Sequence, residues 1–146
     1  MTLVEHRPPF RFAVRTRVGF DETDAQGIVY YGRYMPYFDR ARVEYLRHLG
    51  LLGREPSGAE FVMRALEVRY HAPARFDDEL EVFARVRRLG RTSVTWEFDA
   101  YEVESGEHLA SSSQTLVQVD PDRRRPAEVG RGFRAAVSAF ETEVEQ

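Results

Sequence analysis

The segment from Asp21 to Tyr34 holds the residues best suited to chemistry, because it places carboxylates directly before the expected start of a helix. The first N–H groups of a helix lack partners within the helix and carry partial positive charge. They can stabilise a carbonyl oxygen that becomes an oxyanion, while a nearby carboxylate attacks the carbonyl or activates a water. A thioester suits this arrangement, since its thiolate leaves without strong acid assistance. Asp24 is the candidate carboxylate; a turn or helix-capping role is the alternative.

Signatures of several other chemistries are missing. The chain has no cysteine, which excludes disulfides, thiolate nucleophiles and cysteine metal ligands. It contains no G-x-S-x-G elbow, P-loop, strand-associated G-x-G-x-x-G or H-E-x-x-H motif. The histidines lack metal-ligand spacing, so we expect no metal site. The serines at 111–113 are predicted to form a polar outer strand face rather than to supply a nucleophile.

Composition favours a small domain without a nucleic-acid partner. The chain has 146 residues, a length typical of one domain, and a formal net charge of −3. That net acidity argues against nucleic-acid binding through Arg85, Arg87, Arg88, Arg91 and the Arg123–Arg125 run. No apolar run is long enough to span a membrane and the N-terminus has no apolar signal core, so we expect a cytoplasmic protein. A domain this small has little room for a deep private cavity, which places a sizeable ligand in a groove or between subunits.

Hydrophobic periodicity predicts an α+β domain with one long helix. Residues 10–20 alternate as a half-buried strand does, and from Tyr31 the apolar spacing changes to three and four residues. The helix should begin near Tyr31 to Arg33 and run to about Leu49, since proline is tolerated only in the first turn and Pro36 lies there. Four further strands, in meander order, are expected at 61–71, 80–86, 94–100 and 109–119. A weaker helical pattern is expected at 127–143.

Specific motifs carry a family resemblance. The stretch from Val18 to Gly50, V-G-F-D-E-T-D-A-Q-G-I-V-Y-Y-G-R-Y-M-P-Y-F-D-R-A-R-V-E-Y-L-R-H-L-G, resembles the signature of hotdog-fold thioesterases of the 4-hydroxybenzoyl-CoA thioesterase / YbgC type. Three shorter blocks are also similar to that family: Y-H-A-P-A-R-F-D-D at 70–78, L-G-R-T-S at 89–93, and R-P at 125–126. Together these blocks cover roughly residues 10 to 130.

The resemblance implies a hotdog fold, with an antiparallel sheet of about five strands wrapped round one long central helix, and a C-terminal helix. Residues 1–146 would form a single domain, with a loose lead-in at 1–9 and a helical tail at 127–146. It also implies hydrolysis of an acyl-CoA thioester. Asp24 matches the catalytic aspartate, as nucleophile or general base. Gly27 matches the glycine that lets the loop approach the substrate, and the Tyr31 backbone N–H, helped by that of Gly32, matches the group that polarises the carbonyl.

The same resemblance suggests how substrate is held. Arg88, Arg91, Thr92 and Ser93 are candidates for binding the coenzyme A nucleotide, and a solvated hairpin is the alternative for them. Coenzyme A is part of the substrate, so no cofactor is implied, and the family assembles as homodimers or homotetramers with sites between subunits. Tyrosine rather than histidine at position 31 favours aromatic or bulky acyl groups.

Two other functions remain open from the sequence. A hotdog hydratase of one subfamily needs a histidine about five residues after the aspartate, and Val29 lies there, which argues against hydration. A non-catalytic module that binds acyl-CoA or an acyl-carrier protein would not need Asp24. Release of free thiol from acyl-CoAs distinguishes a thioesterase from both.

Overall fold

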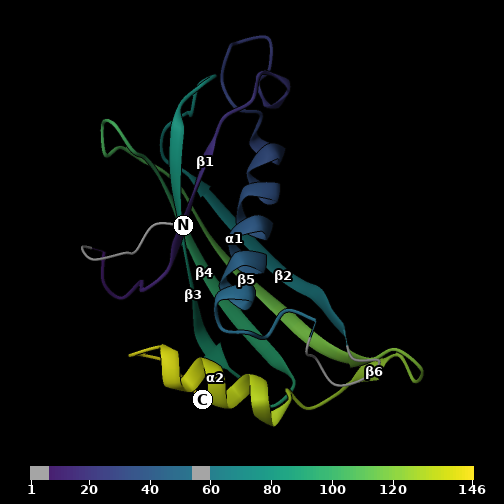
Figure 1. The fold of residues 1–146 in the computed structure, drawn as a ribbon. Coiled ribbons are helices and arrows are strands. Elements are labelled where there is room, and N and C mark those ends of the chain that lie inside the picture. The colour runs from purple at the N-terminus through teal and green to yellow at the C-terminus, as the bar shows by residue number, and fades with distance from the viewer. Residues whose placement is uncertain (1–6, 54–59) are drawn as a thin grey trace.

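The structure, a computed structural model, describes residues 7–53 and 60–146 and consists of one curled sheet, one long helix and one short helix (Figure 1). The elements are, in chain order, β1 (Ala13–Arg17), the 3-10 turns η1 (Phe20–Glu22) and η2 (Tyr31–Arg33), α1 (Tyr34–His48), β2 (Glu60–Tyr70), β3 (Glu79–Leu89), β4 (Ser93–Glu102), β5 (His108–Asp120), β6 (Arg125–Pro126) and α2 (Arg131–Phe140). The predicted α+β class is confirmed. Because η2 leads directly into α1, helical structure starts at Tyr31, as Pro36 requires, and Gly50 follows the helix with a φ of 71°.

The sheet order is β1-β3-β4-β5-β2, with every neighbouring pair antiparallel. Only β3, β4 and β5 form the expected meander. The prediction that β2 takes part in it was wrong, because β2 pairs with β5 and lies at the free edge of the sheet. Sequence spacing cannot decide which edge a strand joins, since both placements bury the same apolar side chains.

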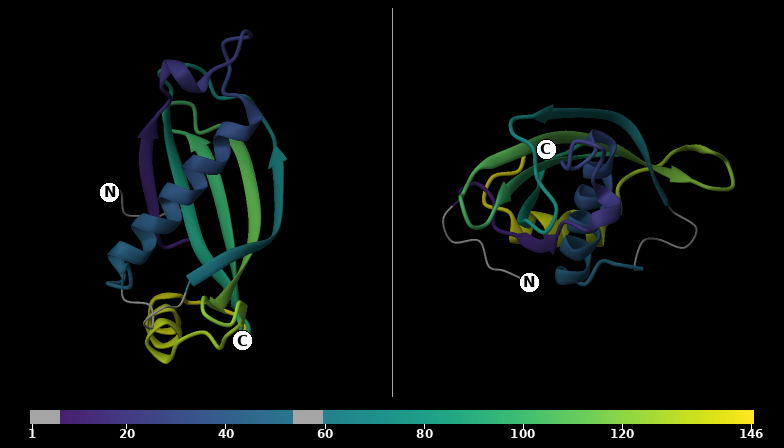
Figure 2. Two further views of the ribbon diagram at one scale, coloured as in Figure 1. Left: turned by 90° about the vertical axis from the view of Figure 1, so that its right-hand side faces the viewer. Right: turned by 90° about the horizontal axis from the view of Figure 1, so that it is seen from above.

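The core lies between α1 and the concave face of the sheet, which curls around the helix (Figure 2). The side chains of Tyr34, Phe38, Ala41 and Tyr45 are buried at this surface of α1. Alternate residues of two central strands meet them: Leu80, Val82, Ala84 and Val86 from β3, with Val94, Trp96, Phe98 and Ala100 from β4. This is the packing predicted for an apolar-faced helix on a one-sided sheet.

The convex face is covered in part by the chain before β1. Phe10 is buried against Phe83 and Ala13, and the Arg7 guanidinium lies 3.5 Å from the centroid of the Tyr101 ring. Residues 7–10 therefore pack on the sheet, and residues 1–6 of the expected loose lead-in lie outside the described part of the chain.

The prediction that the serines at 111–113 form a polar outer face was wrong for Ser112. Ser112, Gln114 and Gln118 share one face, but that face is the concave one and their side chains are 6%, 1% and 3% exposed. Gln114 Nε2 donates to Ser112 Oγ at 3.1 Å, and Arg42 Nη1 donates to Gln114 Oε1 at 3.4 Å. A polar side chain can lie in the core when its hydrogen bonds are met, and alternation alone does not reveal such partners.

Edge strand β2 has an apolar concave face that α1 leaves largely uncovered. A bulge between Met63 and Ala65 shifts the alternation, so that both halves of the strand direct apolar side chains to this face. The residues concerned are Phe61, Met63, Leu66, Val68 and Tyr70. Leu66 and Tyr70 are 47% and 48% exposed, although they lie on the same face as the buried core.

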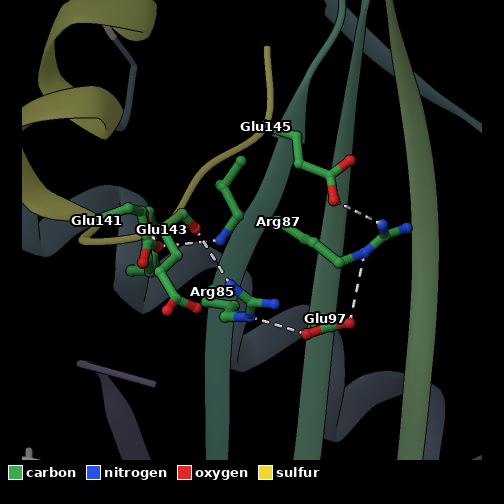
Figure 3. A network of polar contacts seen from close by, with 8 residues as sticks. Arg85, Arg87, Glu97, Glu141, Glu143 and Glu145 are labelled. Carbon is green, nitrogen blue, oxygen red and sulfur yellow. Dashed lines mark hydrogen bonds and ion pairs between the residues drawn. The ribbon is translucent and has the colours of Figure 1, made fainter. Parts of the chain in front are cut away.

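The chain after α2 is fixed to β3 by both backbone and side-chain contacts (Figure 3). The Glu145 N–H donates to the Arg87 carbonyl and the Leu89 N–H donates to the Glu145 carbonyl. Arg85 bridges the Glu97 carboxylate at 2.8 Å and the Glu143 carbonyl at 3.2 Å. These contacts hold α2 across the end of the sheet where α1 terminates (Figure 2).

Candidate active site

Asp24 lies in a tight turn before α1. Its carbonyl accepts from the Gly27 N–H at 2.9 Å, and its carboxylate Oδ1 accepts from the Gln26 N–H at 2.8 Å. Gly27 has a φ of 77°, a conformation that glycine adopts without strain. The turn role given as the alternative for Asp24 is therefore present, but within the described part of the chain it uses Oδ1 alone of the two carboxylate oxygens.

The chain on either side of this turn is fixed to the rest of the fold. Glu22 Oε1 accepts from the Tyr37 hydroxyl at 2.8 Å and from the Gly19 N–H at 2.7 Å, which ties η1 to α1. The Val29 N–H donates to the Ala74 carbonyl at 2.8 Å. Burial is the main cause of the raised pKa of Tyr37, so its hydroxyl remains a hydrogen-bond donor at neutral pH.

Asp24 lines a cavity of about 450 Å³ at the point where η2 begins. The other lining residues come from the turn, from the helix start and from the end of β2: Gln26, Ile28, Val29, Tyr31, Tyr34, Tyr70, His71, Ala72 and Pro73. The cavity thus brings Asp24 and Tyr31, two of the three predicted catalytic residues, to one space, whereas Gly27, the third, shapes the adjoining turn and is not among the lining residues. The Tyr31 N–H is the first of η2 and has no acceptor within the helical turn.

Tyrosines form one wall of this cavity. The Tyr70 hydroxyl donates to the Tyr31 carbonyl at 2.8 Å, and the Tyr34 hydroxyl accepts from the Ala74 N–H at 3.2 Å. The rings of Tyr34 and Tyr70 meet edge to face at 5.4 Å. Burial raises the pKa of both phenols, which therefore stay neutral. The Tyr70 hydrogen bond fixes the peptide plane next to the Tyr31 N–H.

Four of the predicted residues lie elsewhere in the chain. Arg88, Arg91, Thr92 and Ser93 surround the β3–β4 turn, whereas the Asp24 loop lies beside the start of β3. Strand β3 has 11 residues, so these two positions are about 30 Å apart along the sheet. The Arg91 guanidinium is 3.7 Å from the Glu128 carboxylate. One chain therefore does not bring the coenzyme A candidates to Asp24.

The sequence motifs gave no role to several cavity residues. Tyr34 was expected only in the helix core, and Ile28, Val29 and His71 were expected only in loop or strand. The alternating pattern around Tyr70 was visible, but its approach to Tyr31 depends on a contact across 39 residues of chain. Within residues 7–53 and 60–146, no group of three histidine or acidic side chains is arranged to hold a metal ion. In the same ranges, no helix has the length and apolar character to cross a membrane.

Comparison with known proteins agrees with this geometry. Residues 26–107 match the family described as the thioesterase superfamily. The chain belongs to this thioesterase superfamily. It is 37% identical over 121 residues to the acyl-CoA thioester hydrolase YbgC of Escherichia coli O6:H1, a match that covers 80% of this chain and 87% of that protein. The acyl-CoA thioesterase YbgC of Haemophilus influenzae is 30% identical over 128 residues, covering 86% of this chain and 93% of the relative.

A solved structure supports the fold assignment of this thioesterase superfamily member. A crystal structure of a hypothetical protein from Aquifex aeolicus superposes with a TM-score of 0.79 at 28% identity, covering 86% of this chain and 98% of the other. The predicted hotdog fold, with a five-stranded antiparallel sheet around a central helix and a C-terminal helix, is confirmed. The predicted enzyme class, a thioesterase, is confirmed as well.

Proposed function

We propose that this protein hydrolyses an acyl-CoA thioester to the free acid and coenzyme A, with Asp24 as the catalytic carboxylate. The names of the YbgC relatives support an acyl-CoA substrate. The observation that carries the catalytic roles is the cavity shared by Asp24 and the first residue of η2, Tyr31. This cavity brings together a carboxylate and the first N–H of a helical turn, the two groups that acyl transfer to water requires.

In this mechanism the thioester carbonyl oxygen accepts a hydrogen bond from the Tyr31 N–H, with Gly32 as a second donor. As a general base, Asp24 takes a proton from a water while the water oxygen bonds to the carbonyl carbon. The tetrahedral intermediate then expels the coenzyme A thiolate, which takes that proton. As a nucleophile, Asp24 instead bonds to the carbonyl carbon and the C–S bond breaks, which releases the coenzyme A thiolate and leaves a mixed anhydride. Water then cleaves the anhydride to the free acid and the Asp24 carboxylate, and a proton from that water goes to the thiolate. Either route needs only water, the carboxylate and amide donors, with coenzyme A entering as part of the substrate.

The Asp24→Asn variant tests the catalytic role. Asparagine can still accept the Gln26 N–H through its amide oxygen, so the turn should persist while the base is lost. We expect kcat to fall about 100-fold or more, in line with loss of a principal catalytic group. Thiol release from aromatic, short and long acyl-CoAs measures it.

Asp21→Asn is the matched control, since Asp21 is exposed, lies three residues away and is not among the cavity residues. Equal turnover by wild type and Asp24→Asn would exclude this mechanism. Single-turnover hydrolysis in H₂¹⁸O separates the two routes, because label found in the Asp24 carboxylate can arise only from an enzyme-bound anhydride.

We also propose that two copies pair through β2. Among residues 7–53 and 60–146, this strand is paired along one side only, by β5, and its apolar concave face is exposed; proteins seldom leave either feature uncovered. A two-fold axis across the middle of β2 would extend the sheet antiparallel into the second copy and cover Met63 and Leu66. The arrangement is isologous, so it closes as a dimer.

This pairing also bears on the distant coenzyme A candidates. In an antiparallel β2 pair, the Glu60 end of one strand meets the Tyr70 end of the other. The β3–β4 turn of one copy then lies toward the Asp24 cavity of its partner. Arg88, Arg91, Thr92 and Ser93 are thus proposed to hold the coenzyme A whose acyl group is cleaved in the partner subunit.

The Leu66→Arg variant tests the pairing, because it places a charge at the centre of the uncovered concave face. We expect the dimer dissociation constant to rise about 30-fold or more, as for loss of a central interface residue. Light scattering over a concentration series measures it. Glu107→Arg, in the exposed β4–β5 turn, is the control for added charge. A Leu66→Arg protein that stays dimeric at the same concentrations as wild type would contradict pairing through β2.

A further inference from the structure

A second cavity lies near the C-terminal end of α1, away from the Asp24 cavity. It has a volume of about 280 Å³ and is bounded by Arg42 and Leu46 of α1, Glu60 and Phe61 of β2, Trp96, Leu116, and Phe133 of α2. Five of these seven residues are apolar or aromatic. The Phe61 and Phe133 rings pack at 5.5 Å, so α2 forms the end wall of the cavity.

The charged atoms at this cavity are already partnered in part. Arg42 lies 3.0 Å from the Asp39 carboxylate and donates to Gln114 at 3.4 Å. Glu60 is exposed at the rim. The remaining lining suits a hydrocarbon, and its volume is well above the roughly 150 Å³ that holds benzene in an engineered apolar cavity. An aromatic ring with several methylenes would fit.

The position of this cavity relates it to the partner's site. Within one chain, Leu46 is 12 residues along α1 from Tyr34, a distance of about 18 Å, so only a long chain could reach it from the same subunit's Asp24. The Glu60 end of β2, however, is the end that the proposed dimer places against the Tyr70 end of the partner strand, where the partner's Asp24 cavity opens.

We infer that the cavity between α1, β2 and α2 receives the hydrocarbon part of the acyl group cleaved by the partner's Asp24, and that Phe133 sets how large this group can be. The inference rests on the proposed function and on the β2 pairing. It assigns bulky apolar acyl groups, aromatic or of medium length, as the substrate class. It also gives α2 a role in substrate specificity, although α2 lies far from the Asp24 loop of its own chain.

Several contacts hold α2 in place, as a rigid end wall of the cavity requires. Phe133 and Val137 are buried, the Arg134 guanidinium donates to the Gly90 carbonyl at 2.6 Å, and the chain beyond α2 is bonded to β3 (Figure 3). A wall held at both ends of its helix can discriminate by size, since an apolar pocket distinguishes one methylene by about tenfold or more.

Two variants of opposite sense test the assignment. Leu46→Trp fills the cavity from a half-buried position on α1, and Phe133→Ala enlarges it. The test is to measure kcat/KM of wild type and both variants for acetyl-, hexanoyl-, decanoyl-, benzoyl- and phenylacetyl-CoA. Wild type should prefer the larger groups over acetyl by about tenfold or more. Leu46→Trp should lower kcat/KM for them about tenfold more than it lowers kcat/KM for acetyl-CoA, and Phe133→Ala should shift the optimum to larger groups.

Phe140→Ala is the matched control, because Phe140 lies on the same helix but packs on Tyr45 and His48 rather than in the cavity. It should leave the ranking of acyl groups unchanged, and thermal melts show that each variant is folded. A uniform change across all five substrates in both Leu46→Trp and Phe133→Ala would overturn the inference while the proposed function stands. If wild type released no thiol from any substrate, the proposed function would fail, and this inference with it.

Discussion

A carboxylate from outside α1 lies near each end of this helix, and the surroundings of the two carboxylates differ. At the first end Asp24 is half-buried, accepts one hydrogen bond from the Gln26 N–H and lines an open cavity. At the second end Glu141 is 7% exposed, and its Oε2 accepts both the Tyr45 hydroxyl at 2.5 Å and the Val86 N–H at 3.0 Å. A carboxylate is available for chemistry where the fold leaves an oxygen free, and it is structural where buried donors occupy it.

The pKa shifts near the second end of α1 agree with a structural role for Glu141. Burial raises the pKa of Glu141, despite the opposing effect of its hydrogen bonds from Tyr45 and Val86. Burial beside this carboxylate also raises the pKa of Tyr45 far above its ordinary range. The network joins α1, β3 and α2, so changes at this end should affect the free energy of unfolding, whereas changes around Asp24 should affect turnover.

Glu141→Ala should give the largest effect on stability. It leaves the Tyr45 hydroxyl and the Val86 N–H buried without an acceptor, at a cost of about 2–4 kcal/mol in the free energy of unfolding. Chemical denaturation measures it, and kcat toward a short acyl-CoA should stay near the wild-type value. Glu143→Ala is the control, since Glu143 is exposed and its contact with Arg85 is made by its backbone carbonyl, which accepts from Arg85 Nη1 and is kept in the variant. If Glu141→Ala unfolded at the same denaturant concentration as Glu143→Ala, the structural role of Glu141 would be disproved.

Tyr70→Phe should give an intermediate effect of the opposite kind. The ring is kept, but the hydrogen bond to the Tyr31 carbonyl is lost, and one such bond is worth about 0.5–1.5 kcal/mol. We expect kcat/KM to fall about three- to tenfold with an unchanged melting temperature. Tyr101→Phe, on the convex face, should leave both quantities unaltered. A fall in stability without a fall in kcat/KM would place Tyr70 with the structural residues.

The pH dependence of stability should show the smallest effect. Because burial raises the pKa of Glu141, the folded protein holds this proton to higher pH than the unfolded chain does. The contribution to stability is therefore complete below the ordinary value of about 4.5 and is lost as pH rises through the folded-state pKa. Glu141→Gln lacks this equilibrium, so the melting temperature of wild type relative to Glu141→Gln should decline from pH 4 to pH 7. Asp99, whose pKa burial also raises, is common to both proteins and cancels. A constant difference would show that Glu141 titrates alike in both states.

The parts of the fold that could be predicted are those whose signal is local. The α1 face with Tyr34, Phe38, Ala41 and Tyr45 follows from spacing, whereas the hydrogen bond from the Tyr37 hydroxyl to Glu22 does not. Helix spacing predicts two pairs, Asp39 with Arg42 and Arg40 with Glu44. The first is present, whereas Arg40 donates to the Thr16 hydroxyl. A residue's partner along a helix can be counted from sequence, but competition from another element cannot.

By itself the sequence determined the turn before α1 and the closeness of the proposed catalytic residues, because Asp24, Gly27 and Tyr31 lie within eight residues and this turn forms from local backbone preferences. Tertiary structure alone decided that β2 joins the free edge beside β5, that Ser112 and Gln114 face the core, and that α2 closes the second cavity. Each of these depends on which distant segments come together, and the same alternation of apolar and polar residues satisfies more than one such arrangement until the whole sheet is closed around the helix.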